Sequence, residues 1–289
     1  MTRPASRIVY VNGAYLPEEQ ATISIFDRGF IFGDGVYEAT AVIDGNLVDV
    51  GAHLTRLARS CKEISLDLPW SQAELIEIHQ ELIRRNALTE GSIYLQVTRG
   101  ATDRDFLFPK QAASTLVMFP QPRRFVDSPA AKTGIKVASA PDLRWARRDI
   151  KSVNLLPSVL AKQAALEKGA QEVWTTEDGV VTEGGSSTAW IVKDRTLVSR
   201  PLSEKVLPGI TRQAVLAFQK ESGFAFDQRA FTLTEAYAAD EAFITSATNF
   251  VMPVVEIDGH RIGSGTPGQA ASRLREIYIG FARKGGALG

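Results

Sequence analysis

Hydrophobic and polar positions follow different periods along the chain, and these periods predict strands and helices. Short β-favouring runs flank Asn12-Gly13 and Asp44-Gly45. Such dipeptides favour two-residue hairpin turns because both residues tolerate positive φ. In the next segment apolar residues recur at three- and four-residue steps, which predicts an amphipathic helix with Cys61 on its buried face. The N-terminal part is therefore predicted to be a β meander followed by helices.

A second helix is predicted to begin at SQAE, where Ser71 and Glu74 have the spacing of a capping box. His79 borders its apolar stripe, so we expect this imidazole to be a packing residue. Residues 92–99 (SIYLQVTR) and 114–119 (STLVMF) have the composition of strands. The polar loop TDRDFLFPK separates these two strands.

The stretch PQPRRFVDSPAAKTG is rich in proline and charge and has no periodicity, as expected of a linker. We therefore predict a small N-terminal domain over residues 1–124, a linker over 125–133 and a larger C-terminal domain over 134–289.

The C-terminal part alternates between strand and helix signals. Its predicted elements are a strand at 135–139, a helix ending at Gly169, a hairpin around Asp178-Gly179, a helix over 211–222, a short helix capped by Thr234, strands over 241–247 and 252–258, and a terminal helix starting at Thr266-Pro267. Antiparallel hairpins are too frequent for a doubly wound parallel sheet. The predicted fold class is thus mixed α+β and α/β, in two domains.

Composition excludes several classes of protein. Hydrophobic residues make up 44% and charged residues 23%, and no run approaches the roughly 20 apolar residues of a membrane span. Thirty-three basic residues balance 33 acidic ones, so no overall field attracts nucleic acid or a membrane. The single cysteine and the absence of a signal-peptide core in MTRPASRIVYVNG predict a cytoplasmic protein. His53, His79 and His260 are far apart, so we expect no metal site.

Lys151 is the first candidate for chemistry, because it precedes a mostly apolar run and only Asp149 is an acidic neighbour in sequence. Desolvation disfavours a charged lysine and leaves a nucleophilic amine, whose natural use is a Schiff base with a carbonyl. Most lysines are surface groups, however, so position alone favours a solvent-exposed side chain.

Three further segments could assist such an amine. Glu183 lies beside two glycines and several hydroxyls in residues 180–192, and its carboxylate could hold a proton on a pyridine nitrogen. In LPGITRQAVLAF a helix start offers the N–H groups of Ile210 and Thr211, an arrangement that binds phosphate. The hydroxyls of TSATN, residues 245–249, could bind the same phosphate group. Each feature alone also fits an ordinary turn or a capped helix.

Seven segments, in this order, carry a resemblance to a known family: DRGFIFGDGVYE (27–38), HLTRL (53–57), YLQVTRG (94–100), DIKSVNLLPSVLAKQ (149–163), TEGGSST (182–188), LPGITR (207–212) and PVVEIDG (253–259). They resemble those of fold-type IV pyridoxal-phosphate transaminases. KSVNLL is most similar to the lysine segment of D-amino acid transaminases, whereas branched-chain L-amino acid enzymes usually have tyrosine where this chain has Leu155. The resemblance implies a smaller N-terminal α/β domain, a larger cofactor-binding domain with a β-barrel-like core, and a homodimer with active sites at the interface.

The resemblance also implies roles for individual residues toward pyridoxal 5'-phosphate. Lys151 would form the Schiff base and then move the proton of the substrate, and Glu183 would pair with the pyridine nitrogen. The other implied cofactor contacts are Arg56, Ile210, Thr211 and Ser246 at the phosphate, Leu207 at the ring face, and Ser187 nearby. Ala247 stands where the family commonly has threonine, and Thr248 is a possible substitute for the missing hydroxyl.

On the substrate side, the resemblance implies that Tyr37 acts with an Arg-x-His pair of the partner subunit on the α-carboxylate. This chain has Arg104, Asp105 and Phe106 instead, so the arginine is kept and the imidazole is lost. Asp105 could also turn Arg104 away from the substrate.

The leading hypothesis is a ping-pong transaminase that moves an amino group from a D-amino acid to a 2-oxo acid. The alternatives are an (R)-selective amine transaminase, a branched-chain L-amino acid transaminase, aminodeoxychorismate lyase and a non-catalytic relative.

Overall fold

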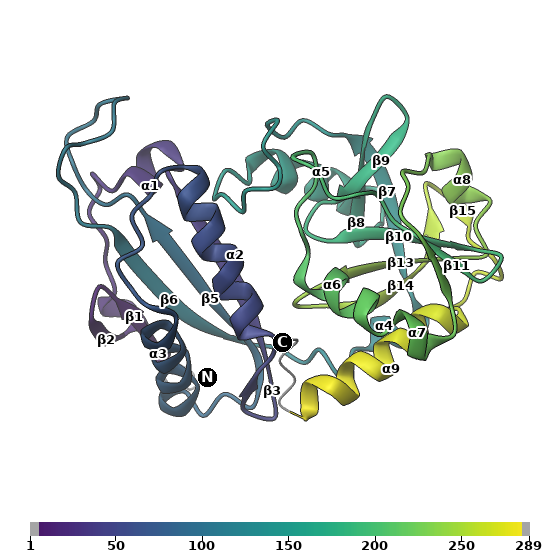
Figure 1. Cartoon of the computed structure of the whole chain (residues 1–289), viewed down its shortest axis with the longest axis horizontal. Coiled ribbons are helices and arrows are strands. Elements are labelled where there is room, and N and C mark those ends of the chain that lie inside the picture. The colour runs from purple at the N-terminus through teal and green to yellow at the C-terminus, as the bar shows by residue number, and fades with distance from the viewer. Residues whose placement is uncertain (1–5, 285–289) are drawn as a thin grey trace. The chain divides into compact units, whose positions relative to one another are not determined.

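The computed structural model describes residues 6–284, which form two compact units (Figure 1). The first unit contains the chain up to Arg124 together with Ile150–Asn154. The second contains Phe125–Asp149 and Leu155–Lys284. The expected linker, residues 125–133, lies in the second unit.

The first unit is built on a six-stranded sheet in which all neighbouring strands are antiparallel, in the order β2-β1-β6-β5-β3-β4. Its strands are β1 (Ile8–Val11), β2 (Ala14–Pro17), β3 (Gly35–Ile43), β4 (Asn46–Leu47), β5 (Glu90–Thr98) and β6 (Thr115–Pro122). The two predicted hairpin turns are confirmed, because Asn12 and Asp44 have φ of 46° and 51° and each is followed by a glycine of positive φ.

Helices α2 (Val50–Glu63) and α3 (Gln72–Arg85) pack against this sheet, and α1 (Arg28–Phe32) and the 3-10 turn η1 (Glu18–Gln20) complete the unit (Figure 1). The amphipathic pattern of α2 buries Leu57 and Cys61 in the core, as the sequence predicts. The capping box of Ser71 and Glu74 at the start of α3 is also confirmed.

His79 on α3 is a buried packing residue. Because its imidazole is buried, we expect the stability of the protein to depend on pH. Its Nδ1 lies 2.7 Å from the carbonyl oxygen of Leu75, and its Nε2 has no hydrogen-bond partner among the described residues. Burial lowers the pKa of His79 to about 4. The unfolded chain binds the proton near the ordinary pKa of about 6.5, so folding free energy is lost as pH falls from about 6.5 to about 4.

We therefore expect the free energy of unfolding to drop by about 3 kcal/mol more in the wild type than in His79→Leu between pH 7.5 and pH 4. Urea denaturation at the two pH values measures this difference. His260→Gln, at an exposed histidine, should keep the wild-type dependence. Equal losses in wild type and His79→Leu would contradict the assignment.

The second unit contains a nine-stranded sheet in the order β12-β11-β10-β13-β14-β7-β8-β9, with β15 on β14. Its strands are β7 (Ile135–Pro141), β8 (Glu172–Glu177), β9 (Val180–Gly184), β10 (Thr188–Lys193), β11 (Thr196–Val198), β12 (Ala225–Asp227), β13 (Glu241–Ser246), β14 (Phe250–Ile257) and β15 (His260–Arg261). Most pairs are antiparallel, but β7 runs parallel to both neighbours. The sheet curls, because β9 and β10 approach each other although they are far apart in the strand order.

Six helices accompany this sheet: α4 (Pro129–Thr133), α5 (Leu156–Glu167), α6 (Ile210–Ala217), α7 (Gln219–Ser222), α8 (Leu233–Tyr237) and α9 (Gln269–Arg283). Among residues 6–284, no helix combines the length and apolar character needed to cross a membrane.

Two predicted helix starts in this unit are wrong. The cap of α8 is Thr232 rather than Thr234, because Glu235 at the third helical position completes a capping box with Thr232. Helix α9 begins at Gln269 rather than at Thr266-Pro267. Its first N–H groups are accepted by the carboxylate of Glu241, which comes from β13 and not from the preceding residues.

Candidate active site

The segment that carries Lys151 is fastened to the start of β3. The backbone N–H of Tyr37 donates to the Lys151 carbonyl at 3.0 Å, and the Lys151 N–H donates to the Ser60 hydroxyl at 3.4 Å. Ser152 forms a β-bridge with Val36. These bonds place a lysine from the middle of the sequence in the first unit.

The Lys151 side chain is half-buried, and its Nζ lies 4.2 Å from the centroid of the Tyr37 ring. Tyr37 in turn stacks on Tyr94 with centroids 5.6 Å apart. Among the residues that the structure describes, Lys151 has no ion pair and no side-chain hydrogen bond. An amine held by an aromatic face keeps its nitrogen available for a carbonyl carbon.

Arg56, on the inner face of α2, is part of a buried ionic network. Its Nε and Nη2 donate to the two carboxylate oxygens of Glu38 at 2.7 and 2.8 Å, and Nδ1 of His53 lies 2.7 Å from Glu38 Oε2. Burial alone would raise the pKa of Glu38, but the charges of Arg56 and then His53 outweigh it, so this pKa lies below its ordinary value. Glu38 therefore orients Arg56, the residue that the resemblance assigns to the cofactor phosphate.

Glu38 was not identified as a site residue from the sequence, although the alternation of side chains along its strand could have indicated it. Tyr37 and Glu38 are consecutive in a strand, so their side chains point to opposite faces of the sheet. A glutamate on the helix-covered face needs a cationic partner. Arg56, in HLTRL on the following helix α2, was a candidate for that partner.

Glu183, near the end of β9, is buried in the second unit. Its Oε1 accepts a hydrogen bond from Nη1 of Arg144, and its Oε2 accepts one from the backbone N–H of Leu207 at 3.1 Å. Burial raises the pKa of the Glu183 carboxyl, and the Arg144 charge opposes this shift. Each oxygen keeps a second lone pair for a further donor.

Arg144 is a residue that the sequence analysis missed. Besides Glu183 it binds Asp142, with Nε 2.9 Å from Oδ1 and Nη2 2.6 Å from Oδ2. Thr182, next to Glu183, donates its hydroxyl to Asp142 at 2.6 Å. Burial would raise the pKa of Asp142, but the Arg144 hydrogen bonds lower it to about 2. The Arg144 guanidinium thus fixes two carboxylates. The sequence signal that could have identified Arg144 is its position two residues after Asp142.

Helix α6 begins at Ile210 and Thr211, and its first turn fits a phosphate group. The cap residue is Gly209, and no side chain caps the helix. The Thr211 hydroxyl is buried and has no hydrogen-bond partner among the described residues. A Cβ at Gly209 would come within 2.9 Å of the Thr188 hydroxyl. Free helix N–H groups and an unpaired buried hydroxyl are what a phosphate dianion requires.

The remaining predicted cofactor contacts also lie in the second unit. Ser246 ends β13, and its hydroxyl accepts the Asn249 N–H at 3.2 Å, while Ala247 and Thr248 form the following turn. The Ser187 hydroxyl donates to Glu172 at 3.1 Å. Leu207 offers its N–H to Glu183, as described above.

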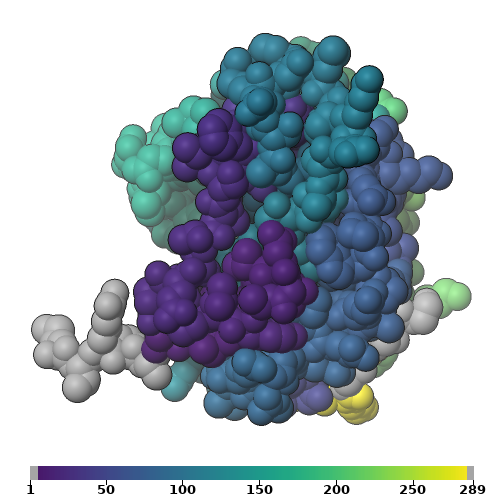
Figure 2. Space-filling model, turned by 90° about the vertical axis from the view of Figure 1, so that its left-hand side faces the viewer, coloured from purple at the N-terminus to yellow at the C-terminus, as the bar shows by residue number. Residues whose placement is uncertain are grey.

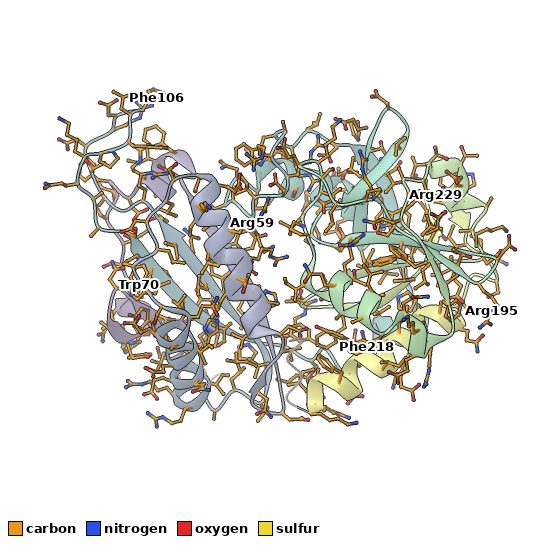
Figure 3. All side chains as sticks on the ribbon, viewed as in Figure 1. Arg59, Trp70, Phe106, Arg195, Phe218 and Arg229 are labelled. Carbon is orange, nitrogen blue, oxygen red and sulfur yellow. The ribbon has the colours of Figure 1, made fainter. Side chains whose placement is uncertain are left out.

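Arg104 and Phe106 lie on the exposed loop between β5 and β6, which stands at the top of the face shown in Figure 2. Phe106 is 76% exposed and is labelled at the outer end of this loop in Figure 3. Neither side chain has a hydrogen bond or an ion pair within residues 6–284, but Cζ of Arg104 lies 5.3 Å from the ring centroids of both Phe32 and Phe106.

Comparison with known proteins identifies the family of this chain. Residues 35–257 match the family described as amino-transferase class IV, so the chain belongs to that family. It is 37% identical to a D-alanine aminotransferase of Staphylococcus haemolyticus over 93% of this chain and 96% of the relative. It is 40% identical to a D-alanine aminotransferase of Bacillus licheniformis, with coverage of 92% and 94%.

Among solved structures, the fold is similar to the branched-chain amino acid aminotransferase of Escherichia coli, with a TM-score of 0.88 and 25% identity over 95% of this chain and 94% of the other. A branched-chain amino acid aminotransferase of T.th., complexed with N-(5'-phosphopyridoxyl)-L-glutamate, has a TM-score of 0.86 and 26% identity, with coverage of 95% and 93%. The chain is therefore an aminotransferase of fold type IV, and its cofactor is pyridoxal 5'-phosphate.

Proposed function

We propose that this aminotransferase transfers the amino group of a D-amino acid to a 2-oxo acid in a ping-pong cycle, with Lys151 as the catalytic residue. The observation that carries the proposal is the amine of Lys151, which lies over the Tyr37 ring without an ionic partner among the described residues. The relatives named D-alanine aminotransferase support the choice of the D-amino acid.

When bound, pyridoxal phosphate supplies an aldehyde that accepts the amino group and a ring that withdraws electrons from the substrate carbon. Lys151 Nζ would be the residue that holds the aldehyde carbon, and as a free amine it would move the proton at the substrate Cα. Tyr37 lies close enough to orient this nitrogen.

Glu183 has the role of holding a proton on the ring nitrogen. Arg144 and the Leu207 N–H bind its two oxygens, so the carboxylate has one fixed orientation. A fixed negative charge next to the ring nitrogen favours its protonated form. The side chain of Leu207 is assigned to the ring face, and Ser187 to the polar surroundings of the cofactor.

The phosphate group is assigned to Arg56 and to the start of α6. Ile210 and Thr211 contribute backbone N–H groups, and the unpaired Thr211 hydroxyl contributes a further donor. Ser246 and the turn of Ala247 and Thr248 are assigned to the remaining phosphate oxygens. Because Ala247 has no hydroxyl, Thr248 is the side-chain donor that this turn offers.

The substrate carboxylate is assigned to Tyr37 and Arg104, with Phe106 in the place of a histidine donor. Arginine binds a carboxylate through two parallel hydrogen bonds. We also propose a homodimer with active sites at the subunit interface, located in the cytoplasm. Light scattering after size-exclusion chromatography should then give about twice the chain mass of 31.5 kDa.

A branched-chain L-amino acid transaminase is the second candidate, because the similar solved structures bear that name. The two are separated by loading the protein with pyridoxal phosphate and adding D-alanine, L-leucine or (R)-1-phenylethylamine. Loss of the cofactor absorbance band with D-alanine but not with L-leucine is the expected result. Loss with L-leucine alone would move the protein to the branched-chain class, and faster loss with the amine would make it an amine transaminase.

A further inference from the structure

The loop that carries Arg104 is anchored by a buried ionic cluster in the first unit. Asp34 pairs with Arg28 at 2.8 Å and with Arg99 at 2.8 Å. Nη1 of Arg28 donates to the backbone carbonyls of Asp105 at 2.6 Å and Leu107 at 3.4 Å. Because Arg28 and Arg99 are themselves fixed by Asp34, the backbone around residue 105 is held in place although its side chains are exposed.

The guanidinium of Arg104 is held by aromatic rings and not by a carboxylate. Its Cζ lies 5.3 Å from the ring centroids of both Phe32 and Phe106, and these two centroids are 5.5 Å apart. The Asp105 carboxylate accepts the Leu107 N–H at 3.1 Å instead. The described residues thus give no support to the idea that Asp105 turns Arg104 away.

We propose that Phe106 is a specificity-determining residue, which acts by holding the Arg104 guanidinium for the carboxylate of the amino donor. This inference rests on the proposed function and extends it, because it makes a carboxylate-bearing donor depend on an aromatic ring that touches the arginine. A phenyl ring donates no hydrogen bond, so Phe106 must act through Arg104.

The physical reason lies in the geometry and entropy of arginine. An exposed arginine has many rotamers, and fixing them on binding costs affinity. A ring next to the guanidinium, here with its centroid 5.3 Å from Cζ, reduces this freedom before the substrate arrives. The N–H groups of a guanidinium lie at the edge of its plane, where a carboxylate accepts two parallel bonds. Phe106 therefore contributes orientation in place of the hydrogen bond of a histidine.

The test compares Phe106→Leu with Phe106→Tyr, because leucine keeps the apolar character and tyrosine also keeps the aromatic face. We expect Phe106→Leu to raise KM for D-alanine by roughly two- to fivefold with kcat little changed, and Phe106→Tyr to stay near wild type. Affinity for pyridoxal phosphate, measured by titrating the cofactor absorbance band, should be unchanged by either, because Phe106 is not assigned to the cofactor. Leu107→Ala is the matched control, since Leu107 is equally exposed at 76% and lies next in the chain.

A double-mutant cycle shows whether Phe106 works through Arg104. In an Arg104→Ala background, Phe106→Leu should have no further effect on KM for D-alanine. An additive effect, or a loss of pyridoxal-phosphate affinity that matches the rise in KM, would overturn the inference. The wild-type donor panel decides the proposed function separately, because a preference for L-leucine would refute that function whatever the Phe106 variants do.

Discussion

Replacing Lys151 by alanine should lower the rate of transamination by about 10⁴-fold or more. The amine is both the point of covalent attachment and the base that moves the substrate proton, so a single substitution removes two functions. Among the described residues, Lys151 is the lysine whose amine lies over the Tyr37 ring. Steady-state turnover of D-alanine with a 2-oxo acid measures the loss.

Covalent attachment can be measured independently of activity. Borohydride treatment of the loaded wild type should leave a cofactor adduct on the peptide that contains Lys151, detected by mass spectrometry. The Lys151→Ala protein should show no such adduct. Lys193→Ala, which removes an exposed amine paired with Asp240, should keep both turnover and adduct. Turnover or attachment that survives in Lys151→Ala would refute the catalytic assignment.

Replacing Glu183 by glutamine should lower kcat by about 10²- to 10³-fold. Glutamine keeps the shape of the side chain but removes the negative charge that would hold a proton on the ring nitrogen. The fold should survive, because Arg144 keeps its two hydrogen bonds to Asp142 and is not left as an unpaired buried charge. Turnover and thermal unfolding, measured together, separate loss of charge from loss of structure.

The matched control for Glu183 is Glu177→Gln. Glu177 ends β8, at the turn of the same hairpin, and pairs at the surface with Lys205 at 2.8 Å. This variant should retain wild-type turnover. A Glu183→Gln enzyme with kcat within a few-fold of wild type would exclude a role of this charge in the reaction. A variant that has lost activity only because it no longer folds would contradict the expectation that the fold survives.

Local signals predicted the elements that depend on a few adjacent residues. The Asn12-Gly13 and Asp44-Gly45 turns need only two residues that tolerate positive φ, and both hairpins form. The capping box at Ser71 needs only Glu74 three positions later. The error at Thr234 arose because Thr232, with Glu235, satisfies the same rule better. The start of α9 could not be found locally, because Glu241 of β13 accepts its first N–H groups.

The candidate site shows the same difference between local sequence signals and contacts between distant segments. Lys151, Glu183 and Arg56 could be named from the sequence, because each stands in a short motif typical of the family. Their partners could not, because Glu38 reaches Arg56 across 18 positions and Arg144 reaches Glu183 across 39. Nor does the order of residues indicate that 150–154 belong to the first unit, where Lys151 meets Tyr37.

The sequence by itself thus determined the turns, the amphipathic helices and the family, and it supplied the candidate residues for the chemistry, because these depend on neighbours or on a motif. Only the tertiary structure decided which charges neutralise one another, which hydroxyl at α6 stays unpaired, and that two phenyl rings hold Arg104. Those outcomes depend on burial and on contacts between distant segments, which the chain acquires only when its strands and helices pack together.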